Sequence, residues 1–368
     1  MRTTQVSGLR KDIKVFVSIG ILAWNEEKNI GKTLVSLFNQ SVFSKENGMS
    51  TQYQWEIVVV PNGCKDNTAS TASEVFQQWA SELSEIEANY KVVEIEQAGK
   101  SNAWNRYVHE FSNQSADFLI LIDADIEFGN PRTIENVLAT INSTPAADAV
   151  VDLPLKDLVK KKPKNPVEWF SLKFSSVSLD GPPGICGQFY CARGNTLRNI
   201  WMPVGLSNED GFLKAMIVTD LFRSEVDNAK VVRAHDADHF YEAESSIAGI
   251  FKHQLRLVIG TSLNCFLTWD ALLFMTDPEG PGAGELIRNR IKNDPDWYRK
   301  YLRNVVLNKG WWVLPRGMLF GRFYSLNKSS GIKKINKAFV LTVSLLFDLP
   351  VFLLANKKIK SGQAIGYW

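Results

Sequence analysis

Short apolar runs alternate with helical patterns along the first third of the chain. Apolar runs that predict strands occupy residues 15–23, 55–60, 91–95 and 118–122. Between them, the spacing of apolar residues predicts helices over 27–39, 68–87 and 100–111. This alternation predicts an α/β fold in which helices flank both faces of a mostly parallel sheet.

A short polar loop follows each predicted strand. The loops hold Trp24-Asn25-Glu26, Pro61-Asn62-Gly63, Ala98-Gly99-Lys100 and Asp123-Ala124-Asp125. Right-handed crossovers bring the loops that follow parallel strands to one edge of the sheet, where open α/β sheets bind their ligands. We therefore expect the four polar loops to converge on one site.

The last of these loops carries two carboxylates, Asp123 and Asp125, directly after a buried strand. Paired carboxylates suit a hard divalent cation, which keeps water and phosphate oxygens as its other ligands. The pair therefore predicts a metal–nucleotide site. The alternative interpretation is a solvated surface loop, because exposed aspartates are common.

Composition narrows the classes of protein that need to be considered. The chain has 368 residues, 45% of them hydrophobic, and a net charge of +3, so a large core is possible and no nucleic acid partner is indicated. Its four cysteines form no C-x-x-C pair, which disfavours a zinc site and a disulfide framework and fits a reducing compartment. Residues 10–24 resemble the start of a signal peptide, but the polar segment 25–28 follows without a small-residue cleavage site, which favours a buried strand.

Six motifs follow one another in a fixed order. They are Trp24-Asn25-Glu26-Glu27, Pro61-Asn62-Gly63-Cys64-Lys65-Asp66-Asn67-Thr68, Gly99-Lys100-Ser101-Asn102-Ala103-Trp104-Asn105, Asp123-Ala124-Asp125, Gly187-Gln188-Phe189-Tyr190-Cys191-Ala192-Arg193 and Asn208-Glu209-Asp210. In order and spacing they resemble the family 2 glycosyltransferases, over about residues 13–260. The resemblance implies an inverting enzyme of GT-A type, Rossmann-like fold that uses a nucleotide-sugar.

The first loop would then line the nucleotide pocket together with Ala23. Trp24 would stack on the base, in a position where tyrosine is commoner in the family, and Glu26 would bond to the base or the ribose. The alternative for Trp24 is an aromatic side chain of the core.

The second and third loops would complete the donor site. Family members commonly begin the second loop with two acids, whereas this chain has Pro61 and Asn62; the amide of Asn62 could still bond to a base edge, but which base is read stays open. Asp66 is better explained as a turn or helix-capping residue. Lys100 would face the diphosphate, and its alternative is a solvated lysine at a helix start.

The resemblance also assigns the chemistry. Asp125 would bind the metal, Mg²⁺ or Mn²⁺, and Asp123 would bind the metal or the ribose. Asp210, paired with Glu209, would act as the base that takes a proton from an acceptor hydroxyl. The alternative is that Asn208, Glu209 and Asp210 only cap a helix.

Two later segments contain further candidate site residues. His239 or His235 could supply an extra metal ligand, although we favour a polar surface turn for residues 235–239. Arg256 lies where processive polymer synthases carry Gln-x-x-Arg-Trp and could contact the acceptor. Here His253 replaces the glutamine and Leu257 the tryptophan, which favours transfer of a single sugar.

The sequence predicts a catalytic domain over 1–262 and a helical C-terminal region over 263–368. Within the first, we expect a nucleotide-sugar half over about 13–150 and an acceptor half over about 151–262. Residues 338–355 are apolar, lie between lysine clusters and contain Asp348 and Pro350, which favours a helix in the membrane interface over a spanning one. A second apolar run covers 263–275. The alternative is that both runs pack on the catalytic domain.

The sequence as a whole predicts a transferase of a single sugar from a nucleotide-diphosphate sugar, with a UDP-sugar favoured as donor. The acceptor would be a glycan or a lipid-linked alcohol, and the enzyme would act at the cytoplasmic side of a membrane. Two other functions are considered. An inactive nucleotide-sugar binding module would lack the base, and a nucleotidyltransferase would carry a glycine-rich, basic loop after its first strand.

Overall fold

The computed structural model describes residues 14–44, 52–159, 182–244, 246–271, 279–315, 317–321, 323, 326 and 331–363. Eight strands form a single sheet in the order β3-β2-β1-β4-β7-β6-β8-β5. The strands are β1 (Val15–Ala23), β2 (Tyr53–Pro61), β3 (Asn89–Val92), β4 (Phe118–Asp123), β5 (Ile126–Phe128), β6 (Ala149–Lys156), β7 (Phe189–Arg193) and β8 (Val231–Tyr241).

The sheet is mixed in its strand directions. Strands β3, β2, β1 and β4 run parallel, as the sequence predicts for the first half of the chain. Strand β7 then runs antiparallel to both β4 and β6, β8 pairs parallel with β6, and β5 closes the order antiparallel to β8. The α/β fold is therefore confirmed, and its parallel part is concentrated where the polar loops were predicted to converge.

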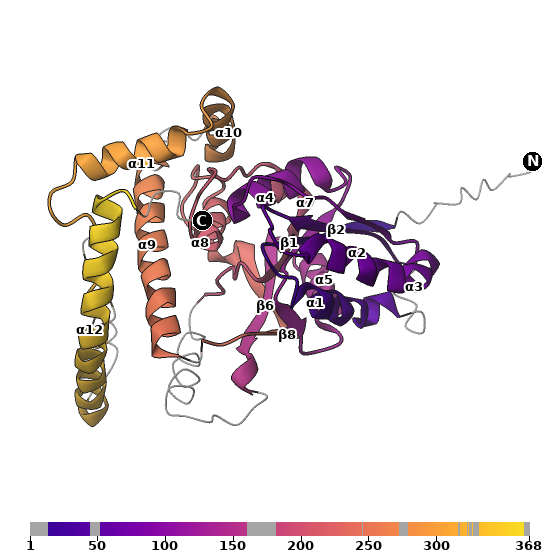
Figure 1. Cartoon of the computed structure of the whole chain (residues 1–368), viewed down its shortest axis with the longest axis horizontal. Coiled ribbons are helices and arrows are strands. Elements are labelled where there is room, and N and C mark those ends of the chain that lie inside the picture. Colours follow the sequence, from indigo (N-terminus) through magenta and orange to yellow (C-terminus); the bar gives the residue numbers. More distant parts are fainter. Residues whose placement is uncertain are drawn as a thin grey trace, which may run out of the picture.

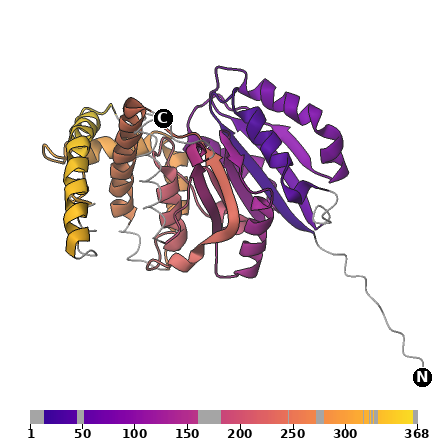
Figure 2. The ribbon, with the colours of Figure 1, turned by 90° about the horizontal axis from the view of Figure 1, so that it is seen from below.

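Helices cover both faces of the sheet (Figures 1 and 2). The helices before residue 219 are α1 (Ile30–Phe38), α2 (Thr68–Gln78), α3 (Ala80–Glu85), α4 (Lys100–Arg106), α5 (Thr133–Ser143), α7 (Gly194–Arg198) and α8 (Glu209–Val218). A π-helical turn, Tyr107–Phe111, extends α4, and short 3₁₀ turns cover Ser41–Phe43, Asp157–Val159 and Asn228–Lys230. Two hydrophobic cores result, one beneath α1, α2 and α5, the other beneath α4 and α8.

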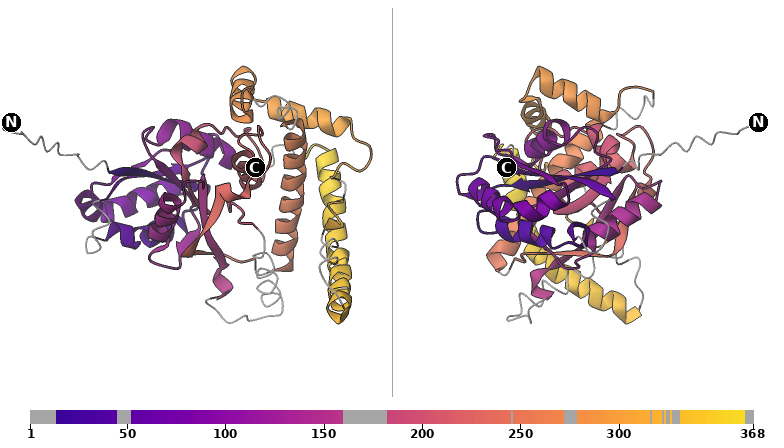
Figure 3. Two further views of the ribbon diagram at one scale, coloured as in Figure 1. Left: turned by 180° about the vertical axis from the view of Figure 1, so that it is seen from behind. Right: turned by 90° about the vertical axis from the view of Figure 1, so that its right-hand side faces the viewer.

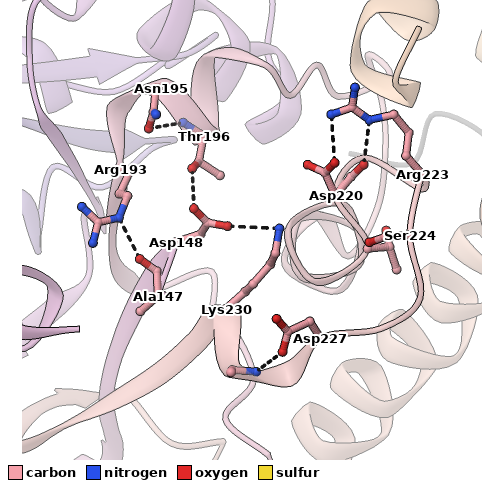
Figure 4. Close-up of polar contacts among 12 residues, drawn as sticks. Ala147, Asp148, Arg193, Asn195, Thr196, Asp220, Arg223, Ser224, Asp227 and Lys230 are labelled. Carbon is pink, nitrogen blue, oxygen red and sulfur yellow. Dashed lines mark hydrogen bonds and ion pairs between the residues drawn. The ribbon is translucent and has the colours of Figure 1, made fainter. Parts of the chain in front are cut away.

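The second half of the sheet is joined by a group of polar contacts at the start of β6 (Figure 4). Asp148 accepts a hydrogen bond from Thr196 Oγ1 at 2.9 Å and lies 3.4 Å from Lys230 Nζ. Arg193 Nε donates to the carbonyl of Ala147 at 2.8 Å. Side chains from α7, β7 and the turn before β8 thus fix the edge of β6, which makes this group structural.

Residues 235–239 are part of β8 and do not form the surface turn that we expected. The strand continues through these residues, and its pairing with β6 resumes after a shift in register between Val151 and Leu153. Asp236 takes a left-handed φ of 51° at this irregularity, and His235 is exposed while His239 is fully buried. The polar sequence therefore reflects a bulged strand with one side chain turned into the protein.

In the described part of the chain, four helices follow β8: α9 (Ile247–Ala271), α10 (Ala283–Asn293), α11 (Trp297–Leu307) and α12 (Gly331–Lys360). Helix α12 packs on α9, on the side away from the sheet (Figures 1 and 3). The predicted domain boundary at residue 262 falls inside α9, and the second apolar run enters the same helix, with residues 272–275 outside the described ones. No helix in the described part of the chain combines the length and the apolar character needed to cross a membrane.

In the core beneath α4 and α8, a close approach to Tyr107 requires glycine at position 20. A Cβ atom built there would lie 2.5 Å from the ring of Tyr107, which is fully buried. The Tyr107 hydroxyl donates to Ser18 Oγ at 3.0 Å, and Ser18 Oγ donates to Glu56 Oε2 at 2.7 Å. The central strand therefore carries two small residues because an aromatic ring lies flat against it.

We expect Gly20→Ala to destabilise the fold by about 1–3 kcal/mol, because overpacking forces the Tyr107 ring out of place. The matched control is Gly31→Ala on α1, where a Cβ would meet Val75 and Thr71 at ordinary distances of 3.7 and 3.8 Å. This control should be neutral or stabilising by about 0.5–1 kcal/mol, since glycine disfavours a helix. Urea unfolding of both variants measures the difference, and equal midpoints would contradict the prediction.

Candidate active site

The loops after β1 and β2 are joined by hydrogen bonds at the carboxyl edge of the sheet. The backbone N–H of Glu26 donates to Thr68 Oγ1 at 2.8 Å, and that of Lys65 donates to Asn25 Oδ1 at 2.8 Å. Asp66 accepts from the backbone N–H groups of Glu27 and Thr68 at 3.2 and 3.1 Å. Asp66 is therefore the turn residue that the sequence predicts, and it fixes the two loops relative to each other.

Trp24 projects from this joined pair of loops and is 60% exposed. The interpretation of Trp24 as a core aromatic is therefore wrong. An indole held at the ligand-binding edge of an α/β sheet offers a flat face to a base.

Asn62 is placed differently from our expectation of a base-reading side chain. It is only 3% exposed, and its Nδ2 donates to the carbonyl of Ala23 at 2.7 Å. Its Oδ1 accepts from the backbone N–H of Gly99 at 3.0 Å. The amide therefore links the ends of β1 and β2 to the loop before α4, and Ala23 contributes its backbone carbonyl to that link.

Lys100 begins α4 and lies at the centre of the site. Its Nζ is 2.6 Å from Asp123 Oδ1 and 3.1 Å from Glu209 Oε1, and it donates to the carbonyl of Gly187 at 3.0 Å. Burial alone would lower the pKa of Lys100, but attraction to Asp123 and Glu209 outweighs it and raises the pKa well above its usual range. The interpretation of Lys100 as a solvated lysine is wrong, because its ammonium group contacts Asp123, Glu209 and the carbonyl of Gly187.

Four carboxylates interact with this one lysine: Asp123 and Glu209 contact it directly, and Asp125 and Asp210 interact with it electrostatically. Burial raises the pKa of Asp123 to about 6, with Lys100 opposing the shift and Asp125 adding to it. Burial also raises the pKa of Glu26, Asp125 and Asp210, and an acidic neighbour adds to each shift. Negative charge is therefore only partly compensated by the protein itself, and a divalent cation fits this donor set.

Glu209 and Asp210 form the first turn of α8. The residue before them, Asn208, is left-handed, with φ 60° and ψ 50°, and its side chain makes no capping hydrogen bond. A small, largely apolar cavity beside them is lined by Lys100, Asp123, Gly187, Glu209 and Asp210 together with buried side chains that include Trp104 and Tyr190, so the acid pair lies close to Asp123. The alternative in which these acids serve only as helix caps does not account for this convergence.

Gly187 was part of a motif but was not predicted to have a role. A Cβ atom on it would lie 3.1 Å from both Lys100 Nζ and Glu209 Oε1. Glycine therefore allows the loop before β7 to approach the ion pair closely. The backbone N–H of Asp123 also donates to the carbonyl of Gln188 at 2.8 Å, which fixes the end of β4 against this loop.

His239 is close enough to Asp125 for the two side chains to interact electrostatically. Its Nδ1 is 2.8 Å from Asp152 Oδ2, and its Nε2 is 3.3 Å from Gln188 Oε1. A buried carboxylate on one ring nitrogen fixes the orientation of an imidazole, as is common for metal-binding histidines. Neither Asp152 nor Gln188 was predicted, because each is distant from His239 in sequence.

Arg256 is separate from this cluster in its contacts. It is exposed on α9, and its Nη2 lies 3.4 Å from His253 Nδ1. Its acceptor contact stays a prediction. Across the described residues, no group of three or more His, Cys, Asp or Glu side chains is arranged to hold a metal ion on its own.

Comparisons with known proteins agree with this geometry. Residues 18–197 match the family described as "Glycosyl transferase family 2". The chain is similar in structure to the mannosyltransferase PcManGT from Pyrobaculum calidifontis in complex with GDP-Man and Mn²⁺, with a TM-score of 0.51 and 15% identity over 94% of this chain and 86% of that chain. None of the curated proteins compared matches the chain.

Two further solved structures are less similar. Glucosyl-3-phosphoglycerate synthase from Mycobacterium tuberculosis, in complex with Mn²⁺, UDP and phosphoglyceric acid, has a TM-score of 0.45 and 16% identity over 68% of this chain and 78% of that chain. S. aureus TarS 1-349 in complex with UDP has a TM-score of 0.44 and 14% identity over 95% of this chain and 92% of that chain. The family match over residues 18–197 supports a family 2 glycosyltransferase, and the α/β fold of the chain is GT-A-like.

Proposed function

We propose that the protein is an inverting, metal-dependent glycosyltransferase that moves one sugar from a nucleotide-diphosphate sugar to an acceptor hydroxyl. The observation that carries this proposal is the convergence of Asp123, Glu209 and Asp210 around Lys100. A donor-side carboxylate and an acceptor-side acid pair are thereby held in one pocket. A nucleotidyltransferase has no comparable need for an acid pair at the start of α8.

On the donor side, Trp24 would stack on the base, and Glu26 would bond to the base or the ribose. Asp125, Asp123 and the imidazole of His239 would hold Mg²⁺ or Mn²⁺, which supplies positive charge to the diphosphate leaving group. Lys100 would place its charge beside the same phosphates and lose part of its contact with Asp123 in exchange. We favour a UDP-sugar as donor.

On the acceptor side, Asp210 would take the proton of the attacking hydroxyl. Burial raises its pKa, and a base whose pKa is closer to neutrality is a better proton acceptor. Glu209 is held by Lys100, so it would position the pair while Asp210 remains directed at the acceptor. Attack from the side opposite the leaving phosphate would invert the anomeric centre.

We expect Asp125→Asn to abolish sugar transfer and the metal-dependent part of donor binding while the fold stays intact. The wild type should gain about 2.7 kcal/mol of stability from a ligand at about 100 times its dissociation constant. A thermal-shift screen of UDP-, GDP- and dTDP-sugars with and without Mn²⁺ measures this gain. Asp236→Asn is the control, because its exposed, left-handed position tolerates asparagine. Turnover by Asp125→Asn at the wild-type rate would exclude the metal site.

We expect Asp210→Asn to lower the rate of transfer by about 10²–10⁴-fold, the usual contribution of a general base. Donor binding in the thermal-shift assay should be retained, because Asp210 would act on the acceptor. Loss of donor binding would instead place Asp210 in the donor site. A wild type that binds a donor but never releases nucleotide would favour the inactive binding module.

We also propose that the enzyme acts at the cytoplasmic face of a membrane, on a glycan or lipid-linked acceptor. Leu346, Leu349 and Leu353 form an exposed stripe along α12, at 72%, 42% and 44% exposure. Lysines occupy the last turn of the same helix, as expected for a helix that lies on anionic headgroups. The four cysteines are free, which supports a reducing compartment.

Sedimentation with vesicles tests the membrane proposal. The protein should bind vesicles that contain phosphatidylglycerol more strongly than neutral ones, and added salt should weaken the binding. Replacing the three leucines of the stripe with glutamate should abolish binding. Val226→Glu is the control, because Val226 is 61% exposed on the catalytic part of the chain. Equal binding by the triple variant and the wild type would remove α12 from this role.

A further inference from the structure

We propose that Asn264 and Gly260 of α9 are positioning residues for the catalytic acid pair. They hold Asn208 in the left-handed conformation from which Glu209 and Asp210 enter the site. This inference rests on the proposed function, because it concerns how the base is placed. It adds to that function a role for the long helix that follows the acceptor half.

Asn208 has an unusual backbone conformation. Asn208 has φ 60° and ψ 50°, and Glu209 and Asp210 follow it directly. A non-glycine residue in this conformation costs about 1–2 kcal/mol, although asparagine tolerates it better than most residues. A neighbouring structure must therefore favour it over the ordinary conformations, since a rotation here would move both carboxylates.

Asn264 supplies a contact that fixes this backbone. Its Nδ2 donates to the carbonyl oxygen of Asn208 at 2.6 Å, and Asn264 is only 7% exposed. Its Oδ1 is buried without a hydrogen-bond partner among the described residues. Burying an amide oxygen without a hydrogen-bond partner is unfavourable. The Asn264 side chain is nevertheless buried, and the hydrogen bond that it makes there is the one to Asn208.

Gly260 leaves room for the loop that contains Ser207 and Asn208. It lies one turn before Asn264 on the same face of α9, and a Cβ on it would be 2.9 Å from the Cβ of Asn208 and 3.4 Å from that of Ser207. Between them, Thr261 Oγ1 accepts a hydrogen bond from Asn208 Nδ2 at 3.4 Å. The loop therefore rests directly on the backbone of α9, and any larger residue at 260 has to push it away.

The position of Asn208 in turn determines where Glu209 and Asp210 lie relative to the donor side of the site. Glu209 Oε1 lies 3.1 Å from Lys100 Nζ, and Lys100 contacts Asp123. A shift of Asn208 would thus change the distance between the acid pair and the donor side without removing any residue that contacts the donor. Misplacement of reacting groups by about 1 Å can cost on the order of 10²-fold in rate.

The decisive variant is Gly260→Ala, because alanine favours a helix and should not weaken α9 itself. We expect kcat to fall by about 10–100-fold, with the donor KM and the donor thermal shift unchanged. Asn264→Ala should behave in the same way. Asn208→Ala should lose more activity than Asn208→Gly, since glycine adopts the left-handed conformation without strain.

Two controls separate positioning from general damage. Thr268→Ala removes a hydroxyl one turn further along α9 that donates to the backbone carbonyls of Asn264 and Cys265 in its own helix. Gly31→Ala makes the same glycine-to-alanine change in a helix with room for it. Both should keep wild-type kinetics with UDP-glucose or GDP-mannose and Mn²⁺, assayed by nucleotide release.

Two outcomes overturn the inference, and neither coincides with failure of the proposed function. Wild-type kcat in both Gly260→Ala and Asn264→Ala would do so, even while Asp125→Asn is inactive. The second readout is amide hydrogen exchange, which needs no substrate. Peptides that cover 205–212 should exchange faster in both variants than in the wild type while β1 is unchanged, and identical exchange would exclude the positioning role.

Discussion

The ion-pair contacts of Lys100 hold the two halves of the site together. The lysine is the first residue of α4, yet its ammonium group reaches Asp123 at the end of β4, Glu209 at the start of α8 and the carbonyl of Gly187. Each of these groups comes from a different part of the chain. Because one cation is shared among them, the end of the parallel sheet, the loop before β7 and the start of α8 are fixed relative to one another.

The same arrangement explains the electrostatic state of the site. One lysine cannot neutralise Glu26, Asp123, Asp125, Glu209 and Asp210, and burial weakens the stabilisation that water would give them. The carboxylates are thus held close together at a cost in stability. Functional sites commonly show this kind of conflict between local stability and chemistry.

Sequence patterns predicted β1, β2 and β4 well, because these strands are largely apolar runs followed by polar loops. Strand β3 was predicted at 91–95 but covers Asn89–Val92, where the side chains are mostly exposed and polar. The patterns also predicted that the polar loops meet, which follows from topology alone. The second half was harder. Strand β8 carries His235, Asp236 and His239 on a bulged ladder, so its alternation of buried and exposed residues is interrupted. The site partners that were missed, Asp152, Gln188 and Gly187, act through contacts between distant segments. Asn62 has the composition of a ligand-binding residue but uses both ends of its amide inside the protein, which a sequence does not reveal.

Helix α9 belongs to both halves of the molecule, and this limits how the chain could be rearranged in evolution. One face of the helix supports the loop before the acid pair, while another is covered by α12. A recombination event could bring in new C-terminal helices. If its crossover fell inside α9, this helix would combine residues that are adapted to different neighbours. Exchanges between relatives are therefore better tolerated before the loop that contains Ser207 and Asn208, so that this loop, α9 and α12 are inherited from one parent.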